Sequence, residues 1–225
     1  MVASLILVLL TAQTDVARGR QLFHDGGLGR SGFSCASCHS TVADESKEGD
    51  GLLRAGHTLF GAAKRPHWRG DTRRSAYKDV GAAMDACVDV FMGTQLGAPD
   101  KRALVGFITS ISPKSASPIS IVPGLEASKD YKRDKYANGD PSRGRVLFFR
   151  ACHSCHPGGD QGLGPALFGA TSEAAAMWIR EGNGLLRGKR TKDGHSPFFG
   201  RDRLSDKEVA DIGAFVESLK APGSG

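Results

Sequence analysis

The sequence predicts a mostly α-helical protein made of two tandem domains of the same design. A Cys-x-x-Cys-His pattern occurs twice in the 225 residues, at 35–39 and at 152–156. Each copy follows a segment whose apolar residues recur at helical spacing. Short stretches of the first half also return in the second half in the same order, which is typical of an internal repeat. We therefore expect one helical domain around each copy of the pattern.

Two cysteines three positions apart, followed at once by a histidine, form the attachment pattern of c-type haem. Each thiol would add to one vinyl group of the porphyrin, and the histidine would bind the iron as the proximal ligand. A zinc site, a structural disulfide and a redox-active pair of thiols are the alternatives, but zinc wants four such ligands and a redox pair does not need the histidine. We expect two c-type haems, attached at Cys35 and Cys38 with His39 as ligand, and at Cys152 and Cys155 with His156 as ligand.

The charge of the chain argues against nucleic-acid binding. The formal charge is +6 and the isoelectric point is near 9.2, but haem propionates would cancel much of this excess. No basic stripe interleaved with aromatic residues occurs in the sequence, so no nucleic-acid partner is expected. A mildly cationic face would suit an acidic redox partner protein, and an ordinary solvated surface is the alternative.

The chain begins with an apolar stretch at 1–12, which is too short for a bilayer span of about 20 residues. Such a stretch is typical of a secretory signal, with a cleavage site near Thr11-Ala12-Gln13. We expect 1–14 to be an export segment, with an N-terminal anchor or a buried helix as alternatives. No integral membrane span is expected in the mature chain. An exported, periplasmic location agrees with haem attachment, which takes place outside the cytoplasm.

Between the two halves lies a stretch without core periodicity, rich in proline, serine and charged residues. This composition predicts a linker at 112–139, between a first domain at 15–111 and a second domain at 140–221. Helical spacing in the first domain predicts helices at Asp15–Phe23, Tyr77–Phe91 and Lys101–Ile111.

The internal repeat predicts how the first and last helices of each domain pack. The stretch Gly19–Phe23 returns as Gly144–Phe148, and the surroundings of Phe107 return around Phe215. A glycine on the first helix would let the last helix cross it closely, with the aromatic side chains beside the crossing.

These motifs resemble class I cytochrome c domains over nearly all of the chain after the export segment. The resemblance is most specific in the second half, at Phe148–His156, Gly164-Pro165 and Leu204-Ser205-Asp206. The first half also resembles the bacterial dihaem cytochrome c peroxidases, at Gly19–Phe23, Ser34–His39, Thr58–Ala63 and Trp68. Around Cys87 and Met92-Gly93 the chain is similar to dihaem proteins of the thiosulfate dehydrogenase type.

The resemblance implies that the distal ligand of each iron stands in the loop before the last helix, commonly as a methionine just before a proline. In the second half this position holds His195-Ser196-Pro197. We expect His195 to be the distal ligand there, with an exposed loop histidine as the alternative, and Met177 to lie in the core. A strong sixth ligand favours electron transfer, whereas an open position permits catalysis.

The corresponding loop of the first half offers Cys87 and Met92. Cys87 is the one cysteine that the two haem motifs leave over, and the resemblance to thiosulfate dehydrogenases implies an axial cysteine at such a position. Its alternative is a small buried hydrophobic residue. Cys87, Met92 and a histidine all stay open as the distal ligand. His57 is a poor candidate, because the repeat aligns it with Pro165 on the proximal side of the haem.

Three functions are consistent with these expectations. Electron transfer through two haems, to and from redox partner proteins, needs only what the sequence plainly contains and is favoured. Oxidation of a sulfur compound such as thiosulfate, beside a haem ligated by Cys87, is the second. A peroxidase is the third, and it would need an open iron position and a nearby acid-base group. The stretch Asp89–Gly93 has a phenylalanine where the peroxidases carry a glutamate.

Overall fold

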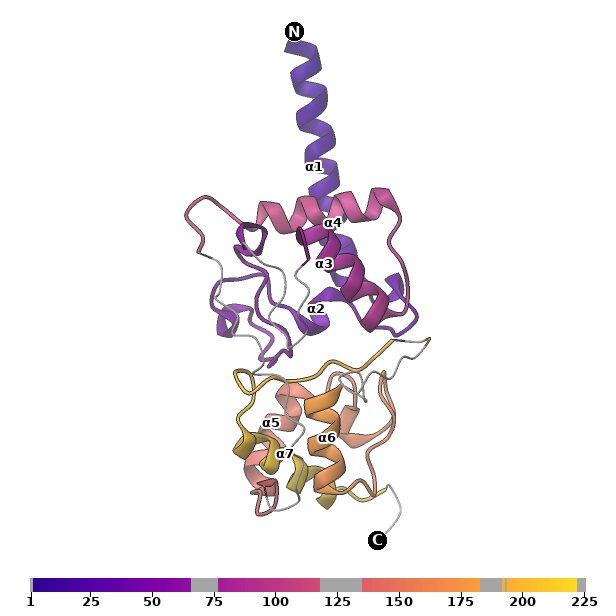
Figure 1. Ribbon diagram of the computed structural model, residues 1–225, viewed down its shortest axis with the longest axis vertical. Coiled ribbons are helices and arrows are strands. Elements are labelled where there is room, and N and C mark those ends of the chain that lie inside the picture. The colour runs from indigo at the N-terminus through magenta and orange to yellow at the C-terminus, as the bar shows by residue number, and fades with distance from the viewer. Residues whose placement is uncertain (1, 66–76, 118–134, 183–191, 193, 222–225) are drawn as a thin grey trace. The chain divides into compact units, whose positions relative to one another are not determined.

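The computed structural model describes residues 2–65, 77–117, 135–182, 192 and 194–221 (Figure 1). In this part of the chain the secondary structure is helical and contains no strand, which confirms the predicted mostly α fold. The α-helices are α1 (Val2–His24), α2 (Cys35–Cys38), α3 (Val80–Cys87), α4 (Ala98–Ser110), α5 (Pro141–Ala151), α6 (Ser172–Glu181) and α7 (Asp206–Ser218). The shorter elements are the 3-10 helices η1 (Gly26–Leu28), η2 (Glu45–Lys47), η3 (Ala62–Lys64) and η6 (Pro157–Gly159), and the π-helix η4 (Val88–Met92).

The chain forms two compact units. Unit 1 takes its described residues from Met1–Gly49, His57–Ile121 and Lys192–Gly194, and unit 2 takes its own from Asp50–Gly56, Val122–Thr191 and His195–Gly225. The segment Asp50–Gly56 thus belongs to unit 2, although the sequence places it inside a first domain at 15–111. Its main chain bonds to other residues of unit 2: the Leu53 amide donates to the Arg150 carbonyl at 2.9 Å, and the Arg203 guanidinium donates to the Arg54 carbonyl at 2.9 Å.

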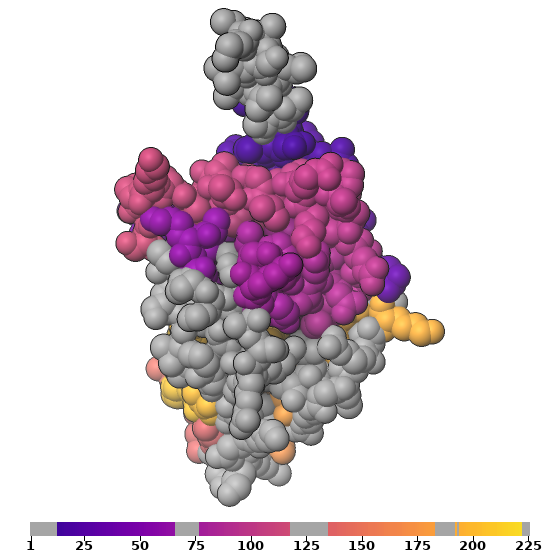
Figure 2. Space-filling model, turned by 45° about the horizontal axis from the view of Figure 1, so that its top comes forward, coloured from indigo at the N-terminus to yellow at the C-terminus, as the bar shows by residue number. Residues whose placement is uncertain are grey.

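In unit 1, α1 and α4 cross at Gly19, as the repeat predicts. A Cβ atom on Gly19 would lie 2.0 Å from the Ala103 carbonyl oxygen, so only glycine allows this approach. Phe23 and Phe107 meet beside the crossing with ring centroids 5.4 Å apart, and both are fully or almost fully buried. Part of α4 lies on the surface of unit 1, beside the surface of the preceding segment, which contains α3 (Figure 2).

The crossing of α5 and α7 in unit 2 repeats this arrangement. A Cβ atom on Gly144 would lie 1.8 Å from the Asp211 carbonyl oxygen. Phe148, which is fully buried, meets Phe215 with ring centroids 5.1 Å apart. The two units therefore use the same glycine and the same aromatic pair at corresponding positions, which confirms the predicted packing of first and last helices.

All three helices predicted in the first domain differ at their ends. Helix α4 spans Ala98–Ser110 rather than Lys101–Ile111. Helix α1 begins at Val2 rather than Asp15 and runs through the predicted export segment, so that its first turns extend away from the rest of unit 1 (Figure 1). Helix α3 begins at Val80 rather than Tyr77, because Asp79 is its N-cap. The Asp79 carboxylate accepts the Ala82 amide at 2.8 Å. Among the described helices, none combines the length and apolarity that a membrane crossing requires.

The α1–α4 crossing gives a test of this packing. Replacing Gly19 with alanine is expected to lower the free energy of unfolding of unit 1 by about 1–3 kcal/mol or more, because the new methyl group meets backbone that cannot move aside. Gly106→Ala on α4 is the matched control, since its Cβ would meet nothing closer than Val16 Cγ2 at 4.0 Å. That variant is expected to stabilise the helix by up to about 1 kcal/mol. Urea denaturation measures both, and equal effects of the two substitutions would contradict the close crossing.

Candidate functional site

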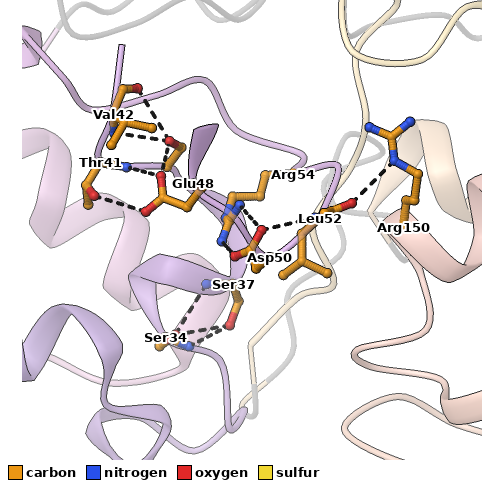
Figure 3. Close-up of polar contacts among 11 residues, drawn as sticks. Ser34, Ser37, Thr41, Val42, Glu48, Asp50, Leu52, Arg54 and Arg150 are labelled. Atoms are coloured by element: carbon orange, nitrogen blue, oxygen red, sulfur yellow. Dashed lines mark hydrogen bonds and ion pairs between the residues drawn. The ribbon is translucent and has the colours of Figure 1, made fainter. Parts of the chain in front are cut away.

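The first cysteine pair lies on α2, a single turn whose start is fixed by a capping box (Figure 3). The Ser34 hydroxyl accepts the Ser37 amide at 3.3 Å, and the Ser37 hydroxyl accepts the Ser34 amide at 3.1 Å. This local turn explains why Cys35 and Cys38 stand one helical turn apart. Two thioether bonds to one porphyrin require that spacing.

His39 follows directly and makes a hydrogen bond that leaves one nitrogen available for a metal. Its Nδ1 lies 2.7 Å from the carbonyl oxygen of His57. A carbonyl can only accept, so Nδ1 carries the proton and Nε2 is the basic nitrogen. Burial lowers the pKa of His39 to about 4, more than offsetting the opposite effect of the hydrogen bond to His57. The imidazole is therefore neutral at pH 7, as an iron ligand must be.

His156 in unit 2 has the same arrangement. Its Nδ1 donates to the carbonyl oxygen of Pro165 at 2.8 Å, and burial likewise lowers its pKa. Gly164 lies against the ring, where a Cβ atom would come within 2.1 Å of the His156 Cε1 atom. Because His57 and Pro165 supply equivalent carbonyls, the predicted alignment of the two is confirmed, and His57 contacts His39.

The cysteines are free thiols in both units. Burial raises the pKa of Cys35 and of Cys152 to about 12, and raises that of Cys155 as well. These side chains are thus protonated, partly buried and close to a neutral histidine with a basic Nε2. This donor set fits a c-type haem in each unit. The part of the chain that the structure covers contains no cluster of three or more His, Cys, Asp or Glu side chains that could hold a bare metal ion.

Cys87 and Met92 lie at the two ends of one irregular helical segment in unit 1. Cys87 is the last residue of α3, and Met92 is the last residue of the π-helix η4 that follows. Such π-helical turns frequently mark functional sites. Met92 is 3% exposed, and it belongs to the same apolar cluster against which Cys35 packs. The carbonyl of Met92 accepts the Arg30 amide at 2.8 Å, which ties the segment to the loop before α2.

Cys87 stands between Met84 and Val88, which belong to the apolar cluster against which Cys35 packs. The thiol is half-buried, and loss of contact with water raises its pKa to about 11. Cys87 also contributes, after the larger effect of burial, to the raised pKa of Cys35. Cys87 and Met92 therefore both stand at the apolar cluster against which Cys35 packs.

His195, the predicted distal ligand of unit 2, is 1% exposed, so the alternative of a solvent-exposed loop histidine is wrong. A buried imidazole can bind a haem iron through one of its ring nitrogens. Met177, which we expected in the core, is half-buried on α6. The residues after His195 run beside α6, where the Phe199 amide donates to the Ile179 carbonyl at 2.7 Å.

Arg180 holds the loop that carries His195, and no sequence pattern predicts this role. This arginine is fully buried on α6; its guanidinium donates to the Phe199 carbonyl at 2.8 Å and to the Asp206 carboxylate at 2.8 Å. Burial acts to raise the pKa of Asp206, but hydrogen bonds from Lys135, Arg201 and Arg180 outweigh this and lower it to about 2. The only sequence signal was Asp206 at the start of the last helix.

Comparison with known proteins found one matching protein family, which covers part of the second half of the chain, and a similar solved structure. Residues 139–216 match the family described as cytochrome C oxidase, cbb3-type, subunit III. A solved structure of a thiosulfate dehydrogenase (TsdBA) from Marichromatium purpuratum, in its as-isolated form, is 18% identical with a TM-score of 0.44. The alignment covers 92% of this chain and 46% of that one, so this chain spans less than half of its length. No curated protein sequence matches the chain significantly.

Proposed function

We propose, from the cytochrome c-type domain at 139–216, that the protein is an exported dihaem cytochrome that passes electrons between redox partner proteins. A cytochrome c-type domain holds a covalently bound haem c, whose iron changes oxidation state by one electron. One observation supports a haem in unit 1 as well. His39 donates a hydrogen bond to the His57 carbonyl at 2.7 Å, just as His156 donates one to the Pro165 carbonyl at 2.8 Å.

The residues would share the work in the same way in both units. The cysteines Cys35 and Cys38, with Cys152 and Cys155, would each add a thiol S–H across a porphyrin vinyl group, which fixes the cofactor without consuming an oxidant. The carbonyls of His57 and Pro165 orient the proximal imidazoles. On the distal side, the buried His195 is the proposed ligand in unit 2, and Cys87 is the proposed ligand in unit 1, with Met92 as its competitor.

Haem content tests this function directly. The full chain, made in a host that attaches c-type haem, is expected to have the mass of the polypeptide plus two haems and an intense Soret band. The oxidised protein is expected to show two low-spin ferric signals in its electron paramagnetic resonance spectrum, since both irons would have six ligands. A protein with the mass of the bare polypeptide and no Soret band would refute the proposal, and one haem would restrict it to unit 2.

A second candidate function is the oxidation of thiosulfate at Cys87. It rests on that thiol, which contributes to the raised pKa of Cys35 and stands directly before a π-helical turn. In this reaction two thiosulfate ions would join through a new sulfur–sulfur bond, and the two electrons released would leave through the haems. Replacing Cys87 with glycine is expected to abolish thiosulfate-dependent haem reduction. Unchanged reduction by the variant would leave electron transfer as the sole function.

A further inference from the structure

The first proximal histidine is linked to a carboxylate through a single peptide group. The peptide between His57 and Thr58 presents its carbonyl oxygen to His39 Nδ1 at 2.7 Å and its amide hydrogen to Glu45 Oε1, with the nitrogen 2.9 Å away. A negative charge at the N–H end of a peptide polarises the whole group and makes its oxygen a stronger acceptor. Glu45 therefore acts on the hydrogen bond that orients the ligand, without touching the ligand itself.

An arginine acts on the next peptide group. The Arg65 guanidinium donates to the carbonyl oxygen of Thr58 at 2.9 Å. Thr58 is 1% exposed, and its hydroxyl donates to the Val42 carbonyl at 2.6 Å, so the backbone at this point is held on several sides.

A further carboxylate anchors the residues after His39. Glu48 accepts the Thr41 amide and the Thr41 hydroxyl, both at 3.0 Å, and also the Ser40 hydroxyl (Figure 3). Glu48 thus faces the main chain beyond the histidine, whereas only Glu45 reaches the peptide that contacts it. Lys47, between the two, has a side chain that is 78% exposed.

The loop that follows His156 is shorter than the loop that follows His39. His57 lies 18 positions after His39, but Pro165 lies only 9 positions after His156. The shorter loop contains a single acidic residue, Asp160, whose carboxylate accepts the neighbouring Gln161 amide and is exposed. The two proximal histidines therefore make the same kind of hydrogen bond to a carbonyl, but the charged groups near that carbonyl differ.

We propose that Glu45, acting through the His57–Thr58 peptide, is a positioning residue that lowers the midpoint potential of the first haem, and that Arg65 opposes it. This inference rests on the proposed dihaem function. A carboxylate that strengthens the hydrogen bond increases the electron donation of the imidazole and stabilises ferric iron. A nearby arginine has the opposite charge and favours ferrous iron. The pair sets the first haem apart from the second, whose proximal loop has no such groups.

Two substitutions with opposite expected signs test the proposal. Glu45→Gln is expected to raise the midpoint potential of the first haem, and Arg65→Gln is expected to lower it, each by a threefold to tenfold change, roughly, in the reduction equilibrium. A tenfold change is about 59 mV for one electron. Potentiometric titration of the full chain, followed by electron paramagnetic resonance, separates the two ferric signals. The second haem serves as the internal reference and is expected not to shift.

The opposite signs of the two shifts in midpoint potential distinguish an effect of the side-chain charges from a role in merely supporting the loop. If both side chains only held the backbone, removing either would weaken the same hydrogen bond, and both potentials would rise. Two shifts of the same sign, or no shift in either variant, would overturn the proposal. Lys47→Gln is the control for an exposed charge on the same loop, and its shift is expected to be much smaller, since solvent and salt screen it.

Conservative variants and maturation complete the test. Arg65→Lys keeps the charge and is expected to keep the wild-type potential more closely than Arg65→Gln does. If Glu45→Gln is made without its first haem, Arg65→Gln carries the test alone: a fall in potential supports the proposal and a rise or no change refutes it. A wild-type protein without a haem in unit 1 would instead refute the dihaem function itself.

Discussion

Replacing Cys152 and Cys155 with alanine is expected to remove one of the two haems and to unfold unit 2, while unit 1 keeps its own haem. Unit 2 has a separate apolar core, built around Phe148 and Leu204 on and next to its crossing helices. A porphyrin held by two thioethers fills a volume that side chains alone do not fill, and a buried cavity of that size would destabilise so small a core. His156 alone would bind haem reversibly.

Mass spectrometry and absorption measure this outcome. The mass is expected to fall by one haem, and the Soret absorption per polypeptide is expected to fall by about half, because one of two similar chromophores is lost. Circular dichroism should show the loss of the helices of unit 2. The matched variant, Cys35→Ala with Cys38→Ala, is expected to lose the other haem. If either double variant kept two haems, the assignment of its motif would be wrong.

The internal repeat allowed the helix crossings to be predicted before the structure was known. Gly19 and Gly144 were identified from sequence because a glycine at a crossing is demanded by sterics that do not depend on distant parts of the chain. The alignment of His57 with Pro165 comes from the same repeat, and in the structure both carbonyls accept a hydrogen bond from the histidine of their unit. Local geometry that recurs in both halves was therefore accessible from the sequence.

Contacts made across long stretches of sequence were not accessible. The link from Glu45 to the Thr58 amide joins a charged loop to a backbone group, and nothing in the local composition marks which carboxylate will make it. Arg180 is fully buried, whereas arginine is ordinarily exposed, so its partners at Phe199 and Asp206 decide its position. The π-helical turn after Cys87 likewise depends on packing, because its residues fit an ordinary α-helical pattern.

The choice of distal ligand in unit 1 separates Cys87 from Met92 in one experiment. Cys87→Ser is expected to change the low-spin ferric signal of the first haem and to raise its midpoint potential by on the order of 0.1 V or more, within the roughly 0.8 V range that axial ligands span. The physical reason is the thiolate, which stabilises ferric iron more than a neutral ligand does. Met92→Leu, which conserves volume, is the matched control and is expected to leave the signal unchanged.

The buried environment of Cys87 sharpens this prediction. In the polypeptide alone, burial raises the pKa of the thiol to about 11, so the thiolate is disfavoured at pH 7. A coordinating metal cation reverses that preference and deprotonates a thiol outright. The thiolate would therefore exist only when the iron is bound, and reduction to ferrous iron would weaken the bond between the thiolate and the iron. If Met92→Leu changed the signal and Cys87→Ser did not, methionine would be the ligand, and thiosulfate oxidation at Cys87 would lose its chemical basis.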